Sequence, residues 1–185
     1  MMFLYIHGFL SSSQSAKAQQ FRHWLTVRGR EHEWLCPDLP MNSNAAMQVL
    51  RECIHSATQP IKLVGSSLGG FYATVLSERF NLRAVVINPA VHPGALLKEK
   101  IGTHKAWHSD NDLLFTQDDV NALNAIDVSS IKCPDNFLLM VEKGDETLDY
   151  RQAIDFYCGC NRLVFNHGNH SFSRFEQVID LIDKF

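Results

Sequence analysis

The chain has 185 residues, of which 45% are hydrophobic and 20% are charged, and its formal net charge at pH 7 is -3. This composition is typical of a folded globular protein, because disordered chains combine low hydrophobic content with high net charge. The slight acidic excess argues against a nucleic-acid partner, which usually meets a basic field. The length fits one domain, so we expect residues 1–185 to form a single unit.

Three patterns bear on where the protein works. The opening residues lack the basic stretch and the cleavage site of a secretory signal. Apolar runs all fall short of the roughly 18 residues that a membrane span needs. The five cysteines are an odd and scattered set, which makes a poor disulfide framework and favours reduced thiols. We therefore expect a cytoplasmic protein without a membrane span.

Short apolar runs alternate with amphipathic stretches along most of the chain. The runs typical of buried strands are 3–6, 34–36, 61–64, 84–87, 137–141 and 162–165. Amphipathic patterns predict helices over 15–27, from 42 or 43, after 70 to about 80, over 148–157 and after 171. Fully apolar strands that alternate with helices are typical of a parallel sheet covered on both faces. The sequence therefore predicts a three-layer α/β/α fold with a short, mostly parallel sheet of about six strands.

Residues 91–132 break this rhythm, and we interpret them as a largely helical or irregular excursion over one face of the sheet. Such a segment is a candidate lid or substrate-covering element. It contains His104 and His108, four residues apart, with Asp110 and Asp112 nearby. Histidines at this spacing on a helix can share a metal ion. The H-E-x-x-H motif is absent, however, so we favour a solvated face and expect no metal site.

The pattern G-x-S-x-G occupies residues 65–69, between a predicted strand and a predicted helix. In that context it is typical of a nucleophile elbow, a strained strand-to-helix turn that exposes a serine. The flanking glycines allow neighbouring backbone to approach closely. Ser67 is therefore the candidate nucleophile, and Ser66 is expected to point elsewhere. The alternative is a Gly/Ser-rich turn without chemistry.

A serine hydroxyl is a weak nucleophile, so Ser67 needs a base and a third group that orients the base. Asp145 follows the predicted strand that ends at 141, and His170 follows the predicted strand that ends at 165. Both therefore lie in loops at the carboxyl ends of strands, where ligands bind in open α/β sheets. The order Ser, Asp, His along the chain is that of the α/β hydrolases.

Rival residues stand close to both candidates. His167 is nearer to its strand than His170, which we prefer because it immediately precedes the last helix. Glu142 and Asp149 are rival acids. Asp149 falls near a predicted helix start, where an acid is favoured by the helix dipole.

Acyl transfer also needs two N–H donors for the oxyanion that develops in the reaction. One comes from the residue after the nucleophile, here Leu68, and the other from a loop after an early strand. The candidate for the second is the N–H of Phe9, in the sequence His7-Gly8-Phe9. Gly8 permits a close turn, and we interpret His7 as a residue that braces the loop.

Five motifs together give a family resemblance. They are Tyr-Ile-His-Gly-Phe at 5–9, Gly-Ser-Ser-Leu-Gly-Gly-Phe-Tyr at 65–72, Asn-Pro-Ala-Val at 88–91, Gly-Asp-Glu at 144–146 and Asn-His-Ser-Phe at 169–172. With them the chain resembles, nearly end to end, the small bacterial esterases of the YqiA type, within the α/β-hydrolase superfamily. The resemblance implies a triad in which Ser67 is the nucleophile, Asp145 the acid and His170 the base. It also implies activity on short acyl esters and, in some members, on acyl-CoA thioesters.

The leading hypothesis is a serine esterase that hydrolyses short-chain carboxylic esters through an acyl-enzyme, without a cofactor. An acyl-CoA thioesterase is the alternative within this class. Lys98, Lys100 and Lys105 could then pair with CoA phosphates, but we favour a solvated face for them. Trp107 and Phe115 either line an acyl groove or pack in the core. From a different class, the chain could be a catalytically silent binding module on a hydrolase scaffold.

Overall fold

The structure is a computed structural model that describes residues 1–105 and 112–185. Its main sheet has six parallel strands in the order β2-β1-β3-β4-β7-β8. In that order the strands are Trp34–Leu35, Met2–Ile6, Ile61–Ser66, Ala84–Ile87, Phe137–Glu142 and Asn161–Phe165. The six-stranded parallel sheet confirms the prediction from the apolar runs.

The register of the strands brings their carboxyl ends to one edge of the sheet. Gly65 pairs with Ile6, and the next residue of β3, Ser66, pairs with Ile87. Glu142, the last residue of β7, pairs with Phe165, the last residue of β8. Every loop that follows one of these strands therefore starts at this edge.

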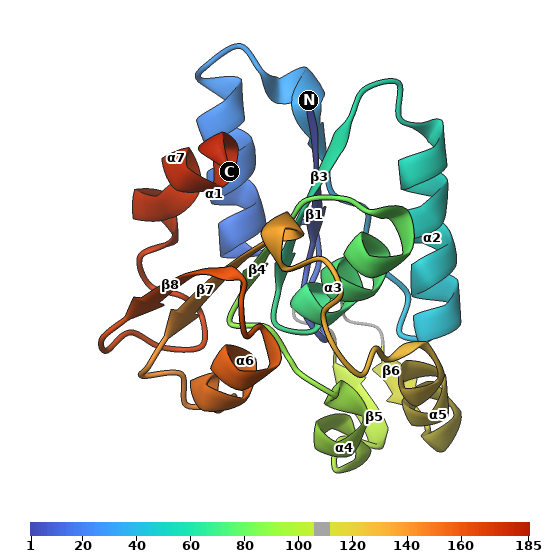
Figure 1. Cartoon of the computed structure of the whole chain (residues 1–185). Helices are drawn as coiled ribbons and strands as arrows, with labels where there is room; N and C mark the ends of the chain where they lie inside the picture. The colour runs from blue at the N-terminus through green and yellow to red at the C-terminus, as the bar shows by residue number, and fades with distance from the viewer. Residues whose placement is uncertain (106–111) are drawn as a thin grey trace.

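Helices cover both faces of the sheet. On one face lie α1 (Ala16–Thr26) and α7 (Phe175–Lys184), and on the other lie α2 (Ser43–Ser56), α3 (Leu68–Phe80) and α6 (Tyr150–Phe156) (Figure 1). Successive strand residues point to opposite faces, so each strand supplies both cores. In β1, for example, Phe3 packs with the α1 side and Leu4 with the α2 and α3 side. The predicted three-layer α/β/α architecture is thus confirmed.

The residues at the ends of α1 and α2 differ in how they bind the helix backbone. Asn42 caps α2, because its side-chain oxygen accepts hydrogen bonds from the backbone N–H groups of Asn44 and Ala45. Ser15 occupies the N-cap position of α1 but makes no capping hydrogen bond through its side chain. Gly29 follows α1 with a φ of +70°, in the left-handed region that commonly ends helices.

The segment 91–132 differs from the expectation of helical or irregular structure. It holds α4 (Pro93–Lys98) and α5 (Gln117–Ile126), but also an antiparallel pair, β5 (Gly102–Lys105) and β6 (Asp112–Phe115). β5 is only four residues long and lacks an apolar run, so its sequence gives no signal of a buried strand. These elements lie together at the lower edge of the molecule in Figure 1, beyond the lower ends of the central strands.

Two short 3-10 turns, Glu31–Glu33 and Pro134–Asn136, complete the described secondary structure. Within residues 1–105 and 112–185, no helix combines the length and the apolar character required to cross a bilayer.

Candidate active site

Ser67 stands on a strained turn between β3 and α3, with φ 56° and ψ -122°. A positive φ is uncommon for a residue with a side chain, so the surrounding structure must hold it. The backbone N–H of Ser67 donates to the carbonyl of Ile87, and its carbonyl accepts from the N–H groups of Gly70 and Ala90. Gly69 allows this turn to pack closely, because a Cβ at that position would lie 1.9 Å from the carbonyl oxygen of Ile6.

A continuous hydrogen-bonded chain joins the three predicted residues. The Nε2 atom of His170 lies 3.1 Å from Ser67 Oγ, and its Nδ1 atom lies 2.8 Å from Asp145 Oδ2. A carboxylate only accepts hydrogen bonds, so the proton of a neutral His170 resides on Nδ1. Nε2 is then free to accept the proton of the Ser67 hydroxyl.

Asp145 is held more firmly than the histidine that it contacts. Its Oδ1 atom accepts hydrogen bonds of 2.8 Å from the backbone N–H groups of Thr147 and Leu148. The Asp145 side chain is only 2% exposed, against 24% for His170. A buried, fixed carboxylate behind a partly exposed imidazole is the arrangement that orients a base toward its nucleophile.

The rival residues occupy other positions. His167 is exposed, and its carbonyl accepts from the backbone N–H of Gly144. Asp149 caps α6 through the N–H of Arg151 and pairs with the Arg151 guanidinium. Glu142 is fully buried and contacts the loop around His170. Ser66 is buried in β3.

The two candidate oxyanion donors flank Ser67. A Cβ added to Gly8 would lie 3.2 Å from the Cβ of Ser67, which places the loop after β1 directly beside the turn. Leu68 begins α3, where backbone N–H groups have no intrahelical partner. Among residues 1–105 and 112–185, neither the Phe9 nor the Leu68 N–H donates to another protein group.

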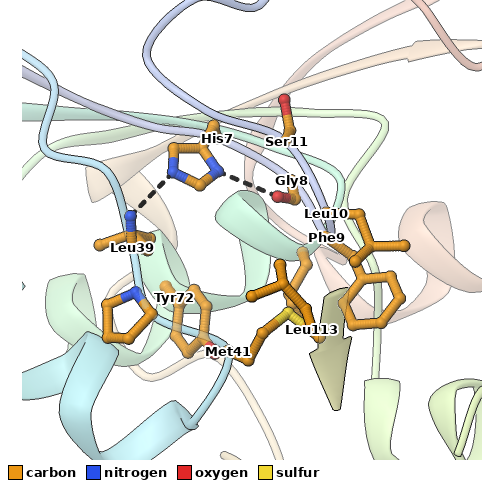
Figure 2. Close-up of a pocket in the computed structure, with 11 residues that line it drawn as sticks. His7, Gly8, Phe9, Leu10, Ser11, Leu39, Met41, Tyr72 and Leu113 are labelled. Carbon is orange, nitrogen blue, oxygen red and sulfur yellow. Dashed lines mark hydrogen bonds between the residues drawn. The ribbon is translucent and has the colours of Figure 1, made fainter. Parts of the chain in front are cut away.

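His7 ties the loop after β1 to the segment that follows β2. Its Nδ1 atom donates to the carbonyl of Gly8, and its Nε2 atom accepts from the backbone N–H of Leu39, both at 3.0 Å (Figure 2). Burial lowers the pKa of His7, which favours the neutral ring that this accepting role requires. His7 therefore braces the loop, as the sequence suggested.

A small, mostly apolar pocket lies between the loop after β1 and the segment 39–41 (Figure 2). Leu68, the chain neighbour of Ser67, is part of its lining. Its volume is about 40 Å³. The side chains that give it an apolar wall are those of Phe9, Leu10, Leu39, Pro40, Met41, Leu68, Tyr72 and Leu113. Residues 39–41 were not predicted to be part of the site. Nothing in these three residues indicates that His7 holds them against the pocket.

Two aromatic residues of the segment 91–132, Trp107 and Phe115, were candidates to line an acyl groove or to pack in the core. Phe115 is 1% exposed and packs edge-on against Phe9, with ring centroids 5.2 Å apart. Phe115 therefore packs in the core, where its ring contacts the ring of Phe9. Trp107 lies outside the described residues.

The candidate metal ligands give no cluster among the residues that the structure describes. No group of three or more His, Cys, Asp or Glu side chains there is arranged to hold a metal ion. His104 instead contacts the carbonyl of Lys100 and the ring of Phe9. His108 and Asp110 lie outside the described residues, and Lys98, Lys100 and Lys105 are exposed.

Comparison with solved structures shows the α/β-hydrolase fold. The chain matches alpha/beta hydrolase domain-containing protein 10 from mouse with a TM-score of 0.71 and 15% identity, covering 98% of this chain and 89% of that one. It matches Paleococcus ferrophilus monoacylglycerol lipase with a TM-score of 0.71 and 14% identity, over 99% and 94% of the two chains. It matches Est1E from Butyrivibrio proteoclasticus with bound ferulic acid with a TM-score of 0.67 and 15% identity, covering 100% of this chain and 87% of that one.

A comparison with protein families gives one match that spans nearly the whole chain. The model described as "Uncharacterised protein family (UPF0227)" matches residues 2–185.

Proposed function

The chain belongs to UPF0227, an uncharacterised protein family, and from this premise we propose that it is a serine hydrolase that cleaves short-chain acyl esters. The observation that carries the proposal is the hydrogen-bonded chain from Ser67 through His170 to Asp145. The α/β-hydrolase fold agrees with it, and esterases and a lipase are among the solved structures of that fold.

In the proposed reaction, His170 Nε2 takes the proton of the Ser67 hydroxyl as its oxygen attacks the acyl carbonyl. Asp145 keeps the Nδ1 proton in place and stabilises the imidazolium that forms. The imidazolium then gives its proton to the leaving alcohol, and an acyl group remains on Ser67. Water, activated by the same histidine, releases the acid and restores the enzyme. The mechanism requires no cofactor.

The N–H groups of Phe9 and Leu68 are the proposed oxyanion donors. Both flank Ser67, and neither is used by another described protein group. Two preorganised donors aimed at the developing negative charge lower the barrier, and loss of one typically costs 100- to 1,000-fold in kcat, about 3–4 kcal/mol.

The pocket beside Leu68 is the proposed acyl site. Its volume of about 40 Å³ suits an acyl group of few heavy atoms, since one buried water needs roughly 10–15 Å³. Leu113 supplies part of its wall, which supports a substrate-covering role for the segment 91–132. We therefore expect acetyl and butyryl esters to have a higher kcat/KM than octanoyl esters.

The test is the intact mass of the protein after brief exposure to a fluorophosphonate probe, followed by hydrolysis of p-nitrophenyl acetate, butyrate and octanoate. Wild type should gain one adduct and Ser67→Ala none, with turnover lowered by roughly 1,000-fold or more. Ser66→Ala, which alters the neighbouring serine, is the matched control and should retain labelling. Folded wild type without an adduct, or Ser67→Ala with near-normal turnover, would contradict the proposal.

Matched oxygen and sulfur esters of the same acyl group separate esterase from thioesterase activity in the same assay. A higher kcat/KM for the acyl-CoA substrate would move the assignment to a thioesterase with the same triad. A protein that binds esters without turnover would instead be a binding module.

A further inference from the structure

The loop 166–173, which carries His170, must cross the ends of two strands to reach Ser67. β8 is three positions from β3 in the sheet order, and neighbouring strands are about 4.8 Å apart, so the loop and the His170 side chain together span about 14 Å. A misplacement of about 1 Å in a catalytic group can cost roughly 100-fold in rate. The loop therefore needs support from the two strands that it crosses, β4 and β7.

β7 provides this support through Glu142, its last residue, whose side chain is fully buried. Glu142 Oε2 accepts from the backbone N–H groups of Asn169 at 2.8 Å and Ser173 at 3.0 Å. Its Oε1 accepts from the Ser173 hydroxyl at 3.1 Å and lies 3.2 Å from Arg174 Nε. A buried carboxylate is costly unless it is paired and hydrogen-bonded, and here the loop itself supplies the partners. These partners stand on both sides of His170.

β4 provides a second support through Asn88, which directly follows the strand and is 3% exposed. Its Nδ2 atom donates to the carbonyls of Asn169 at 3.0 Å and His170 at 3.2 Å. Its Oδ1 atom accepts from the backbone N–H of Glu142 at 2.9 Å. The Asn88 side chain therefore binds the backbone of Glu142 as well as that of the loop.

We propose that Glu142 and Asn88 are positioning residues, which hold His170 within reach of Ser67 and Asp145 by binding the backbone on either side of it. This inference rests on the proposed function. From the sequence, Glu142 was only a rival to Asp145 as the triad acid. The contacts assign it a different role, because it acts through the loop backbone and Asp145 contacts the imidazole.

Three variants test the proposal, and each removes a different set of contacts between the loop and its supporting side chains. Glu142→Gln keeps the shape of the side chain but removes its charge and one acceptor. Asn88→Asp keeps the oxygen that accepts from the backbone N–H of Glu142 but removes the N–H donors to the two loop carbonyls. Ser173→Ala alters an exposed residue and removes only one hydroxyl contact to Glu142. The matched control is Asp149→Asn, which changes a nearby carboxylate that caps α6.

The readouts are kcat and KM for p-nitrophenyl acetate, the urea midpoint of unfolding, and the NMR resonance of the His170 Nδ1 proton. We expect kcat to fall by roughly 10- to 100-fold in Glu142→Gln and Asn88→Asp and about three-fold in Ser173→Ala, with KM within about two-fold. The Nδ1 proton should exchange faster in each, because the imidazole is no longer held against Asp145. Asp149→Asn should resemble wild type.

Folded variants with kcat within two-fold of wild type would overturn the proposal, as would a lower kcat with an unchanged Nδ1 resonance. If the two buried-site variants fail to fold, Ser173→Ala decides by the same criteria. A wild type that neither hydrolyses esters nor reacts with the fluorophosphonate contradicts the proposed function instead. In that case the Nδ1 resonance still reports whether Glu142 holds the loop.

Discussion

Gly168 combines a left-handed backbone with a crowded position for a Cβ, whereas Gly29 has the left-handed backbone alone. The φ of Gly168 is +84°, and a Cβ there would lie 1.9 Å from Glu142 Oε2. Gly29 has a similar φ of +70°, but a Cβ there would meet nothing within 4 Å. The pair therefore separates the strain of a left-handed backbone from the crowding of a buried carboxylate.

Gly29→Ala should lower the free energy of unfolding by about 1–2 kcal/mol, which is the cost of a left-handed conformation for an L-residue. Gly168→Ala should lower it further and also reduce kcat, because the new methyl group displaces the Glu142 carboxylate from the loop. Urea unfolding and ester hydrolysis measure the two effects. Equal losses of stability in the two variants, with unchanged kcat in both, would contradict the crowding argument.

The start of α5 shows how one element is fixed to its neighbour. Thr116 Oγ1 accepts from the backbone N–H of Asp119, and the Asp119 carboxylate accepts from the backbone N–H of Thr116 at 2.8 Å, which completes a capping box. The same carboxylate accepts from Asn42 Nδ2 at 2.9 Å, so the caps of α5 and α2 are joined. α5 directly follows the β5–β6 pair and thereby ties the excursion to the main fold.

Thr116→Val keeps a β-branched side chain of similar size but removes the capping oxygen. The free energy of unfolding should fall by about 1 kcal/mol, a common value for the loss of a cap. Thr26→Val is the control, since the Thr26 hydroxyl donates to the carbonyl of Arg22 on an exposed helix face, where changes are usually within about 0.5 kcal/mol. Thermal or urea unfolding compares them, and equal effects would argue against the capping box.

Arg30 joins parts of the chain that lie far apart in sequence. Its guanidinium makes paired hydrogen bonds to the Glu33 carboxylate, at 2.9 and 2.8 Å, and to the Asp183 carboxylate, at 3.0 and 2.8 Å. The hydrogen bonds from Arg30 hold the pKa of both carboxyl groups below their ordinary values. This cluster connects the segment before β2 with the end of α7.

These lowered pKa values predict an acid-dependent contribution to stability. A carboxyl group with a lower pKa in the folded state stabilises the fold above its ordinary pKa, 4.5 for Glu33 and 3.8 for Asp183, and this is lost as pH falls through the folded value. Arg30→Met should therefore cost about 1–2 kcal/mol near neutral pH, since the cluster is partly exposed. The difference from wild type should shrink below about pH 4.

Urea unfolding at neutral pH and at about pH 3.5 measures this change. Arg22→Met is the control, because the Arg22–Glu31 pair is about half exposed on both sides and should contribute less than about 1 kcal/mol. A difference between Arg30→Met and wild type that is the same at both pH values would contradict the linkage.

Much of the fold followed from local patterns. All six strands of the main sheet and the helices that cover it were predicted, because short apolar runs alternate with amphipathic stretches along the chain. The predicted burial was wrong for β8, whose residues Asn161, Arg162 and Val164 are exposed. The turn at 65–69 was also predicted from the sequence. Its glycines are needed because a Cβ at Gly65 or Gly69 would collide with neighbouring backbone atoms. The assignment of Ser67, Asp145 and His170 as a catalytic triad stays a prediction, and the labelling experiment tests its nucleophile.

Other features depended on contacts between distant segments. The sequence favoured Asp145 as the acid but left Glu142 and Asp149 as rivals, and the contacts of the three carboxylates separate their positions. Asp145 meets the imidazole, Asp149 caps α6, and Glu142 turns under the loop around His170. The hairpin of β5 and β6 likewise escaped prediction. Local sequence sets which elements form, but burial and partners are set by packing between segments, which no single stretch of sequence encodes.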